Sequence, residues 1–92
     1  MTVADTIRQK IADALDPEEL VVEDQSAQHA GHAGARPGGE THFRLVIVAE
    51  SFAGLSRIDR QRRVHEILAA ELAGPVHALS IVARTPAEAG DR

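Results

Sequence analysis

The sequence has 92 residues, of which 43% are apolar, and its formal net charge at pH 7 is −4. This length suffices for one compact domain but not for two, so we expect a single domain over residues 1–92. The negative charge disfavours an electrostatic grip on a nucleic-acid backbone by the domain as a whole. The sequence has no cysteine, which excludes disulfides, thiol catalysis and a metal cluster held only by its own thiolates.

Neither a membrane segment nor a secretion signal is evident. No stretch reaches the ~20 apolar residues that a membrane-spanning helix needs. The first residues, 1–5, lack the basic region and the apolar run of a signal peptide. We therefore expect a cytosolic protein without a membrane span.

Residues 2–15 show the pattern of an amphipathic helix. Apolar residues recur every four positions and therefore share one face, namely Val3, Ile7, Ile11 and Leu15. Thr2 can cap the start of this helix together with Asp5, and Pro17 prevents its continuation. The next segment, 20–24, is short and rich in β-branched residues, which predicts a strand.

Residues 25–39 differ abruptly from the rest in composition. They include four glycines, one proline and two histidines, His29 and His32. Because this stretch has too few apolar side chains for a strand or a stable helix, it predicts a glycine- and histidine-rich loop. Long loops inside small domains are often functional, which draws attention to the two histidines.

The second half of the chain predicts further regular structure. Residues 41–49 have apolar side chains at both alternating sets of positions, which indicates the central strand of a sheet. Ser56, followed by Asp59, can cap a helix over 57–73, and the Gly74–Pro75 pair would end it.

The C-terminal part predicts a last strand over 76–83 and a frayed acidic tail over 86–92. The order helix, strand, strand, helix, strand is typical of a two-layer α+β domain. The first two strands can pair as a hairpin. The second helix then crosses over and places the last strand parallel to its neighbour, which gives a mixed three-stranded sheet.

Histidine is the residue type whose number and placement most suggest a binding site. Five occur in the chain, and neutral imidazole is a good ligand for iron and borderline metals. His29 and His32 lie in the predicted loop, where each is either a metal ligand or a solvated side chain. His77 opens the last strand, where it is either a ligand or a packed, hydrogen-bonded residue. We interpret His42 and His65 as structural or surface residues.

The second predicted helix has the one basic cluster, formed by Arg57, Arg60, Arg62 and Arg63. It could contact phosphate or an acidic partner, although Asp59 and Glu66 are interleaved with it, as on an ordinary solvated helix face. No nucleophile, acid–base pair or phosphate-binding loop can be placed, so we do not expect an enzyme.

Several segments together resemble the BolA family. They are Asp24–His29, Gly39–Arg44, Phe52–Ser56, Arg60–Arg62, Leu68–Leu72 and Val76–Ile81, and the similarity covers about residues 3–86. The resemblance implies a domain similar to the class II KH fold. It also implies a partnership with a monothiol glutaredoxin, in a heterodimer bridged by a [2Fe–2S] cluster.

The same resemblance implies that His77 is a cluster ligand, together with His29 or His32 from the loop. Since this chain has no thiol, the sulfur donors would be a glutaredoxin cysteine and glutathione. Two residues depart from the family pattern. Gln25 replaces a glutamate, and Gln61 replaces the middle histidine of an Arg-His-Arg motif, which puts contacts through that histidine in doubt.

Two functional hypotheses follow. The first is a non-enzymatic adaptor that helps to ligate an iron–sulfur cluster for cluster trafficking or iron-status signalling. The alternative is a transcriptional regulator that binds DNA through the second helix and its arginines, as some members of the family are described. The net charge and the lack of aromatic stacking residues place this alternative second.

Overall fold

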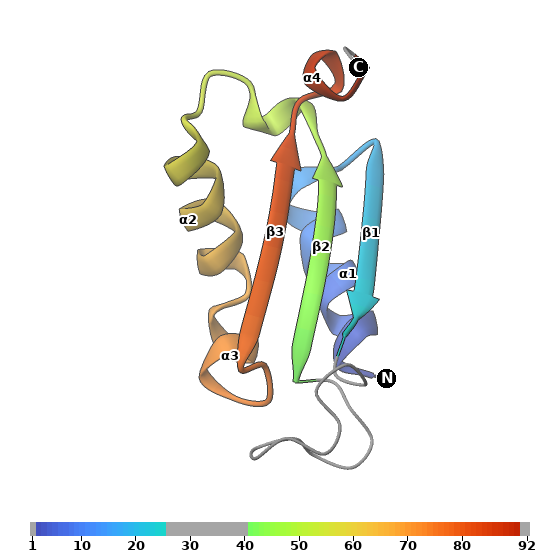
Figure 1. The fold of residues 1–92 in the computed structure, drawn as a ribbon, viewed down its shortest axis with the longest axis vertical. Helices are drawn as coiled ribbons and strands as arrows, with labels where there is room; N and C mark the ends of the chain where they lie inside the picture. The colour runs from blue at the N-terminus through green and yellow to red at the C-terminus, as the bar shows by residue number, and fades with distance from the viewer. Residues whose placement is uncertain (1, 26–40, 91–92) are drawn as a thin grey trace.

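The computed structural model describes residues 2–25 and 41–90. Its elements in chain order are α1 (Val3–Leu15), β1 (Glu19–Asp24), β2 (His42–Val48), the 3₁₀ turn η2 (Glu50–Phe52), α2 (Arg57–Ile67), α3 (Ala69–Ala73), β3 (Ala78–Arg84) and α4 (Pro86–Gly90). Figure 1 shows the three strands side by side. The α+β class and the order of the main elements agree with the sequence-based prediction.

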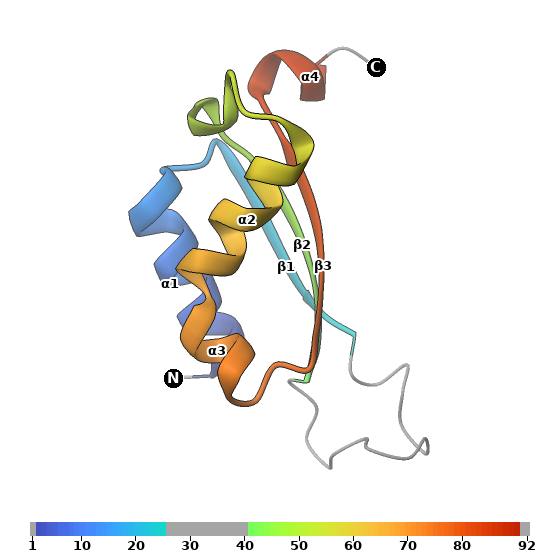
Figure 2. The same cartoon turned by 90° about the vertical axis from the view of Figure 1, so that its left-hand side faces the viewer.

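The sheet has the order β1-β2-β3, with β2 in the centre as expected. Strand β1 pairs antiparallel with β2, with Val21 opposite Val46. Strand β3 pairs parallel with β2, with His42 opposite Ala78. Helices α1, α2 and α3 lie on one face of this sheet (Figure 2). The predicted mixed three-stranded sheet is therefore confirmed.

Helix α1 begins and ends at clear local signals. The Thr2 side chain accepts a hydrogen bond from the Asp5 N–H, and the Asp5 carboxylate accepts one from the Thr2 N–H, so the capping box is complete. At the other end Asp16 adopts a left-handed conformation, with φ of 46°, and its N–H donates to the Ala12 carbonyl. Pro17 follows and prevents another helical turn.

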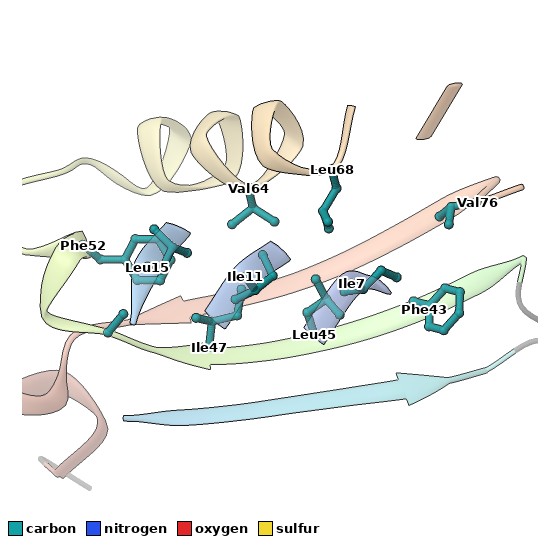
Figure 3. Close-up of a cluster of buried hydrophobic side chains, with 11 residues drawn as sticks. Ile7, Ile11, Leu15, Phe43, Leu45, Ile47, Phe52, Val64, Leu68 and Val76 are labelled. Atoms are coloured by element: carbon teal, nitrogen blue, oxygen red, sulfur yellow. The ribbon is translucent and has the colours of Figure 1, made fainter. Parts of the chain in front are cut away.

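The core lies between the sheet and the helices (Figure 3). Helix α1 contributes three fully or almost fully buried side chains, which are Ile7, Ile11 and Leu15. Strand β2 contributes its alternating set, Phe43, Leu45 and Ile47, and Phe52, Val64 and Leu68 complete the cluster. Each large aliphatic residue stabilises the fold by about 1.5–3 kcal/mol through the apolar area it removes from water.

The helix predicted over 57–73 is not continuous, and in this respect the prediction was wrong. Leu68 leaves the helical conformation, with φ of −103° and ψ of 21°, and divides the segment into α2 and α3. Leu68 is only 1% exposed at this break. The Val76 N–H donates to the Glu71 carbonyl, so the chain after α3 turns back towards the start of β3.

The chain after β3 is also more ordered than predicted. Residues 86–90 form α4, whereas the sequence was interpreted as a frayed tail over 86–92, of which 91 and 92 lie outside the described residues. Thr85 and Glu88 form a reciprocal pair, in which each backbone N–H donates to the other side chain, at 2.8 and 3.2 Å. This capping box, followed by proline at the first helical position, nucleates the turn.

Candidate metal centre at the histidine end of the sheet

Two histidines meet at one end of the sheet, which we call the histidine end and define by Thr41, His42 and His77. Because β2 and β3 are parallel, both strands start at this end, so His42 at the start of β2 and His77 just before β3 become neighbours. The ring centroids are 6.3 Å apart, and the ring planes are inclined at 65°. Two imidazoles from segments 35 residues apart in the sequence therefore share one small region of the surface.

The backbone holds this arrangement in place. The Thr41 carbonyl accepts two hydrogen bonds, from the His77 N–H at 2.7 Å and from the Ala78 N–H at 3.2 Å. Thr41 itself is 2% exposed. The relative position of the two histidines is therefore set by main-chain contacts and by a buried residue, and not by side-chain packing alone.

The same end also bounds segment 26–40, whose residues include His29 and His32. Gln25 is the last described residue before this segment, and its N–H donates to the His42 carbonyl at 2.8 Å. Thr41 is the first described residue after it. The positions of His29 and His32 lie outside the described residues. The two residues that border the segment, Gln25 and Thr41, nevertheless both lie beside His42.

The two rings differ in exposure and in contacts. His77 is exposed and His42 is half-buried. His42 Nδ1 lies 2.9 Å from Thr41 Oγ1, in a hydrogen bond whose donor depends on the tautomer of the ring. Of the two alternatives for His77, a ligand or a packed, hydrogen-bonded residue, its exposure disfavours packing in the core; β3 begins one residue later.

A complete metal site is not present in residues 2–25 and 41–90. No group of three or more histidine, cysteine, aspartate or glutamate side chains in this part of the chain is arranged to hold a metal ion. His42 and His77 can therefore supply at most two nitrogen ligands. Any further ligand must come from segment 26–40 or from another molecule.

Sequence reasoning missed His42 as a member of this group. The signal was available, since residues that start two neighbouring parallel strands lie at the same edge of a sheet. His42 follows Thr41, where the second strand starts, and His77 precedes the last strand. The strand order alone would have brought them together.

The arginine cluster is not one continuous surface. Arg60 is held inside the fold, with its side chain 12% exposed. Its guanidinium donates to the carbonyls of Leu55 and Ala83 and to both carboxylate oxygens of Glu88, and it lies 5.9 Å from the centroid of the Phe52 ring. The predicted contact of Arg60 with phosphate or an acidic partner is therefore not supported, because this side chain already connects α2, η2, β3 and α4.

The ion pair between Arg60 and Glu88 has a clear electrostatic effect. The hydrogen bonds from Arg60, and after them the one from the Thr85 N–H, together lower the pKa of Glu88 from 4.5 to about 2. The Glu88 carboxylate in turn raises the pKa of Arg60. Both groups stay ionised at neutral pH and hold α4 against the end of β3.

The other three arginines are exposed. Arg62 forms only a 3.5 Å contact with Asp59, one turn away on the same helix. Arg57 and Arg63 have no ion pair within the described residues. Arg57 lines a cavity of about 630 Å³ beside β3, together with Arg60 and Arg84. Only the exposed arginines can contribute to contact with another molecule.

Gln61 has a structural contact of its own. Its Nε2 donates to the Ile81 carbonyl at 3.1 Å, which connects α2 to the outer edge of β3. This is the residue that departs from the family's usual histidine. In this chain the position serves the packing of the helix on the strand.

Comparison with known proteins identifies the family. A family model described as BolA-like protein matches residues 11–88. The chain belongs to the BolA-like family. Human BolA-like protein 1 is 52% identical over 82 residues, which are 89% of this chain and 57% of that protein. The DNA-binding transcriptional regulator BolA of Vibrio cholerae is 40% identical over 86 residues, or 94% of this chain and 77% of that protein.

The solved BolA domain of SufE1 from Arabidopsis thaliana has the same fold, with a TM-score of 0.86 at 50% identity over 96% of both chains. This BolA-like chain spans 23% of the Arabidopsis SufE-like protein 1, with which it shares 54% identity over 86 residues, or 89% of its own length. It therefore corresponds to one part of that protein and to somewhat more than half of the human relative. Within residues 2–25 and 41–90, no helix has the length and apolar character needed to cross a membrane.

Proposed function

We propose that this BolA-like chain is a non-enzymatic adaptor that binds a monothiol glutaredoxin and helps to ligate a [2Fe–2S] cluster bridging the two proteins. The role would be cluster trafficking or iron-status signalling, and the cytosolic location stays a prediction. One observation carries the proposal. His77 is exposed at the end of the sheet, next to a second imidazole and close to Gln25 and Thr41, the two residues that border segment 26–40.

The available donors fit one half of such a cluster. Imidazole nitrogens bind iron, whereas the chain has no cysteine with which to supply thiolates. A [2Fe–2S] cluster can accept two histidines on one iron when thiolates bind the other, and this arrangement raises its reduction potential. His77 would be one ligand and His29 or His32 the other, while the glutaredoxin cysteine and glutathione would provide sulfur.

The exposure of His77 matters for a site shared between two proteins. A ligand that was packed in the core could not reach a metal held by a partner. The backbone of His77 is fixed by the Thr41 carbonyl, so only its side chain has to adjust. This fixed backbone lowers the entropic cost of forming the complex.

The test is reconstitution of the cluster with a candidate monothiol glutaredoxin and glutathione, followed by visible circular dichroism. The isolated chain should be colourless, and the mixture should give a spectrum different from that of the glutaredoxin alone. The His77→Ala variant should change the spectrum and release iron faster. The His65→Ala variant is the matched control, since His65 is an exposed histidine on α2 and is not one of the residues that define the histidine end.

Two results would contradict the proposal. One is a spectrum identical to that of the glutaredoxin homodimer when this chain is present. The other is a heterodimer whose spectrum and iron release are the same for wild type and for His77→Ala. Separate His29→Ala and His32→Ala variants identify the loop ligand within the same experiment.

DNA binding is the second candidate, and the similarity of this chain to the DNA-binding transcriptional regulator BolA of Vibrio cholerae is the observation that favours it. The exposed Arg57 and Arg63 would then contact phosphates. Binding to a promoter fragment should weaken as salt rises, and it should fall when both are changed to alanine but not in an Arg8→Ala control on α1. Affinity that is millimolar and independent of DNA sequence would exclude this function.

A further inference from the structure

The outer edge of β3 borders the cavity of about 630 Å³, which the proposed adaptor role does not use. Strand β3 lies at the edge of the described sheet, next to β2 only (Figure 1). The polar and charged side chains around the cavity come from α2, β3 and α4, and they are Arg57, Arg60, Gln61, Arg84 and Glu88. Small-molecule sites have volumes of about 300–1,000 Å³, so this cavity, which we call the β3 cavity, is large enough for a ligand.

The charge around the β3 cavity is opposite in sign to that of the whole chain. Arg60 and Glu88 neutralise one another in their ion pair. Arg57 and Arg84 also line the cavity, and neither forms an ion pair with another described residue. The chain has 14 acidic residues and a net charge of −4, yet these two exposed cations have no carboxylate beside them. A concave surface of this kind attracts an anionic ligand.

The backbone of β3 adds hydrogen-bond donors to the same side. The Arg84 carbonyl accepts from the Ala49 N–H, at the end of β2, so the backbone groups of Arg84 face the sheet. Because these groups alternate along a strand, those of Ile81 and Ala83 face the outer edge. Both residues line the β3 cavity.

The carbonyl groups of this edge are already occupied. Gln61 Nε2 donates to the Ile81 carbonyl at 3.1 Å, and Arg60 donates to the Ala83 carbonyl at 3.2 Å. The edge therefore combines N–H donors and cations with acceptors that are taken. Sheet edges can form anion-binding concavities, and phosphate oxygens accept paired hydrogen bonds from a guanidinium group. This set of groups suits a ligand group that has acceptors only.

We propose that the β3 cavity binds a small phosphate ester. Arg57 and Arg84 contact the phosphate, together with the N–H groups of Ile81 and Ala83. The apolar lining of the cavity, to which Val82 also contributes, contacts the organic part of the ligand. The site is separate from the histidine end, and the proposal does not depend on the adaptor role.

The experiment titrates the full 92-residue chain with phenyl phosphate and, separately, with inorganic phosphate and with phenol. Spectra of ¹H–¹⁵N pairs follow the backbone N–H groups and the arginine Nε–H groups. We expect saturable shifts at Arg57, Arg84, Ile81 and Ala83. Phenyl phosphate should bind about tenfold more tightly than inorganic phosphate, because its ring covers apolar surface of the cavity. Phenol, which has the ring without the charge, should give no saturable shift.

Substitutions then test the two cations. Arg57→Gln and Arg84→Gln should each weaken the binding of phenyl phosphate about tenfold, since each removes a hydrogen bond to a charged group. Arg63→Gln is the matched control, because Arg63 is an exposed arginine of α2 that does not line the cavity, and it should bind like wild type. If a glutamine variant fails to fold, as circular dichroism would show, the lysine variant at the same position replaces it. Lysine keeps the charge but not the paired hydrogen bonds, so its affinity should be intermediate.

The inference is overturned if about 10 mM phenyl phosphate produces no saturable shift at Ile81 or Ala83. Equal weakening by Arg57→Gln, Arg84→Gln and Arg63→Gln would also overturn it, because the attraction would then be unspecific. A duplex DNA fragment that shifts these N–H groups when phenyl phosphate does not would assign the cavity to a DNA interface and remove the small ligand.

Discussion

The two ends of the sheet place basic residues in opposite situations. At the end where β3 leaves the sheet, which we call the arginine end and define by Arg60, Thr85 and Glu88, the charges are joined to one another and to backbone carbonyls. At the histidine end, the imidazole of His77 is exposed while its backbone is fixed. The contrast teaches that a basic residue within a family motif, such as Arg60, can stabilise the fold. An exposed side chain on a fixed backbone, as at His77, is a better sign of a binding role than membership of a motif.

The largest loss of stability should follow from removing the contacts of Arg60 at the arginine end. Arg60→Ala removes the donors to the carbonyls of Leu55 and Ala83 and leaves Glu88 without its cation. We expect the free energy of unfolding to fall by about 2–3 kcal/mol, because hydrogen bonds to charged groups contribute more than neutral ones. Urea denaturation measures this change.

Arg62→Ala is the matched control for that variant. Arg62 is 72% exposed and contacts only Asp59, at 3.5 Å, so its removal should cost less than about 0.5 kcal/mol. Equal losses for Arg60→Ala and Arg62→Ala would show that the buried contacts of the arginine end do not contribute to stability.

The arginine end should also make the stability of the fold depend on pH. The pKa of Glu88 in the folded chain is about 2, below its ordinary value of 4.5, so the unfolded chain binds this proton more readily. The stabilisation by the Glu88 carboxylate is complete above pH 4.5 and is lost as the pH falls towards 2. Thermal unfolding of wild type and Glu88→Gln should differ most at pH 6–7 and converge near pH 2. A constant difference over this range would exclude the ion pair as its source.

The smallest effect on stability should come from His77→Ala. His77 is exposed, and its backbone hydrogen bond to Thr41 does not need the imidazole. We expect the free energy of unfolding to change by no more than about 0.5 kcal/mol. Thermal unfolding without metal checks this, and a loss as large as that of Arg60→Ala would give His77 a structural role.

Local signals predicted most of the fold. The four-residue spacing in α1, the apolar alternation in β2 and the caps at Thr2 and Ser56 each depend on nearby residues, and the structure has all of them. The helix break at Leu68 was not predictable in the same way, because α2 and α3 both have good helix formers on either side of it. The turn there depends on packing against the rest of the core.

The candidate site was predictable only in part. The family motif indicates His77. His42 can be placed beside it only from the parallel pairing of β2 and β3, which brings the starts of both strands to the same edge of the sheet. The role of Arg60 depends on Glu88, 28 residues away, and Glu88 was assigned to a frayed tail. The Thr85–Glu88 spacing matches a capping box, so the local sequence does contain a signal for α4.

The contacts of Arg60 and Gln61 with β3 also help to explain how this protein avoids aggregation through the edges of its sheet. Both side chains donate to carbonyls of an edge strand, at Ala83 and Ile81, and thereby occupy acceptors that another chain would need in order to extend the sheet. At the opposite edge, β1 has Glu19, Glu23 and Asp24, whose like charges repel an identical strand. The β3 edge is thus protected against aggregation by occupied carbonyls, and the β1 edge by charge together with the contact of Arg8 with the Val22 carbonyl.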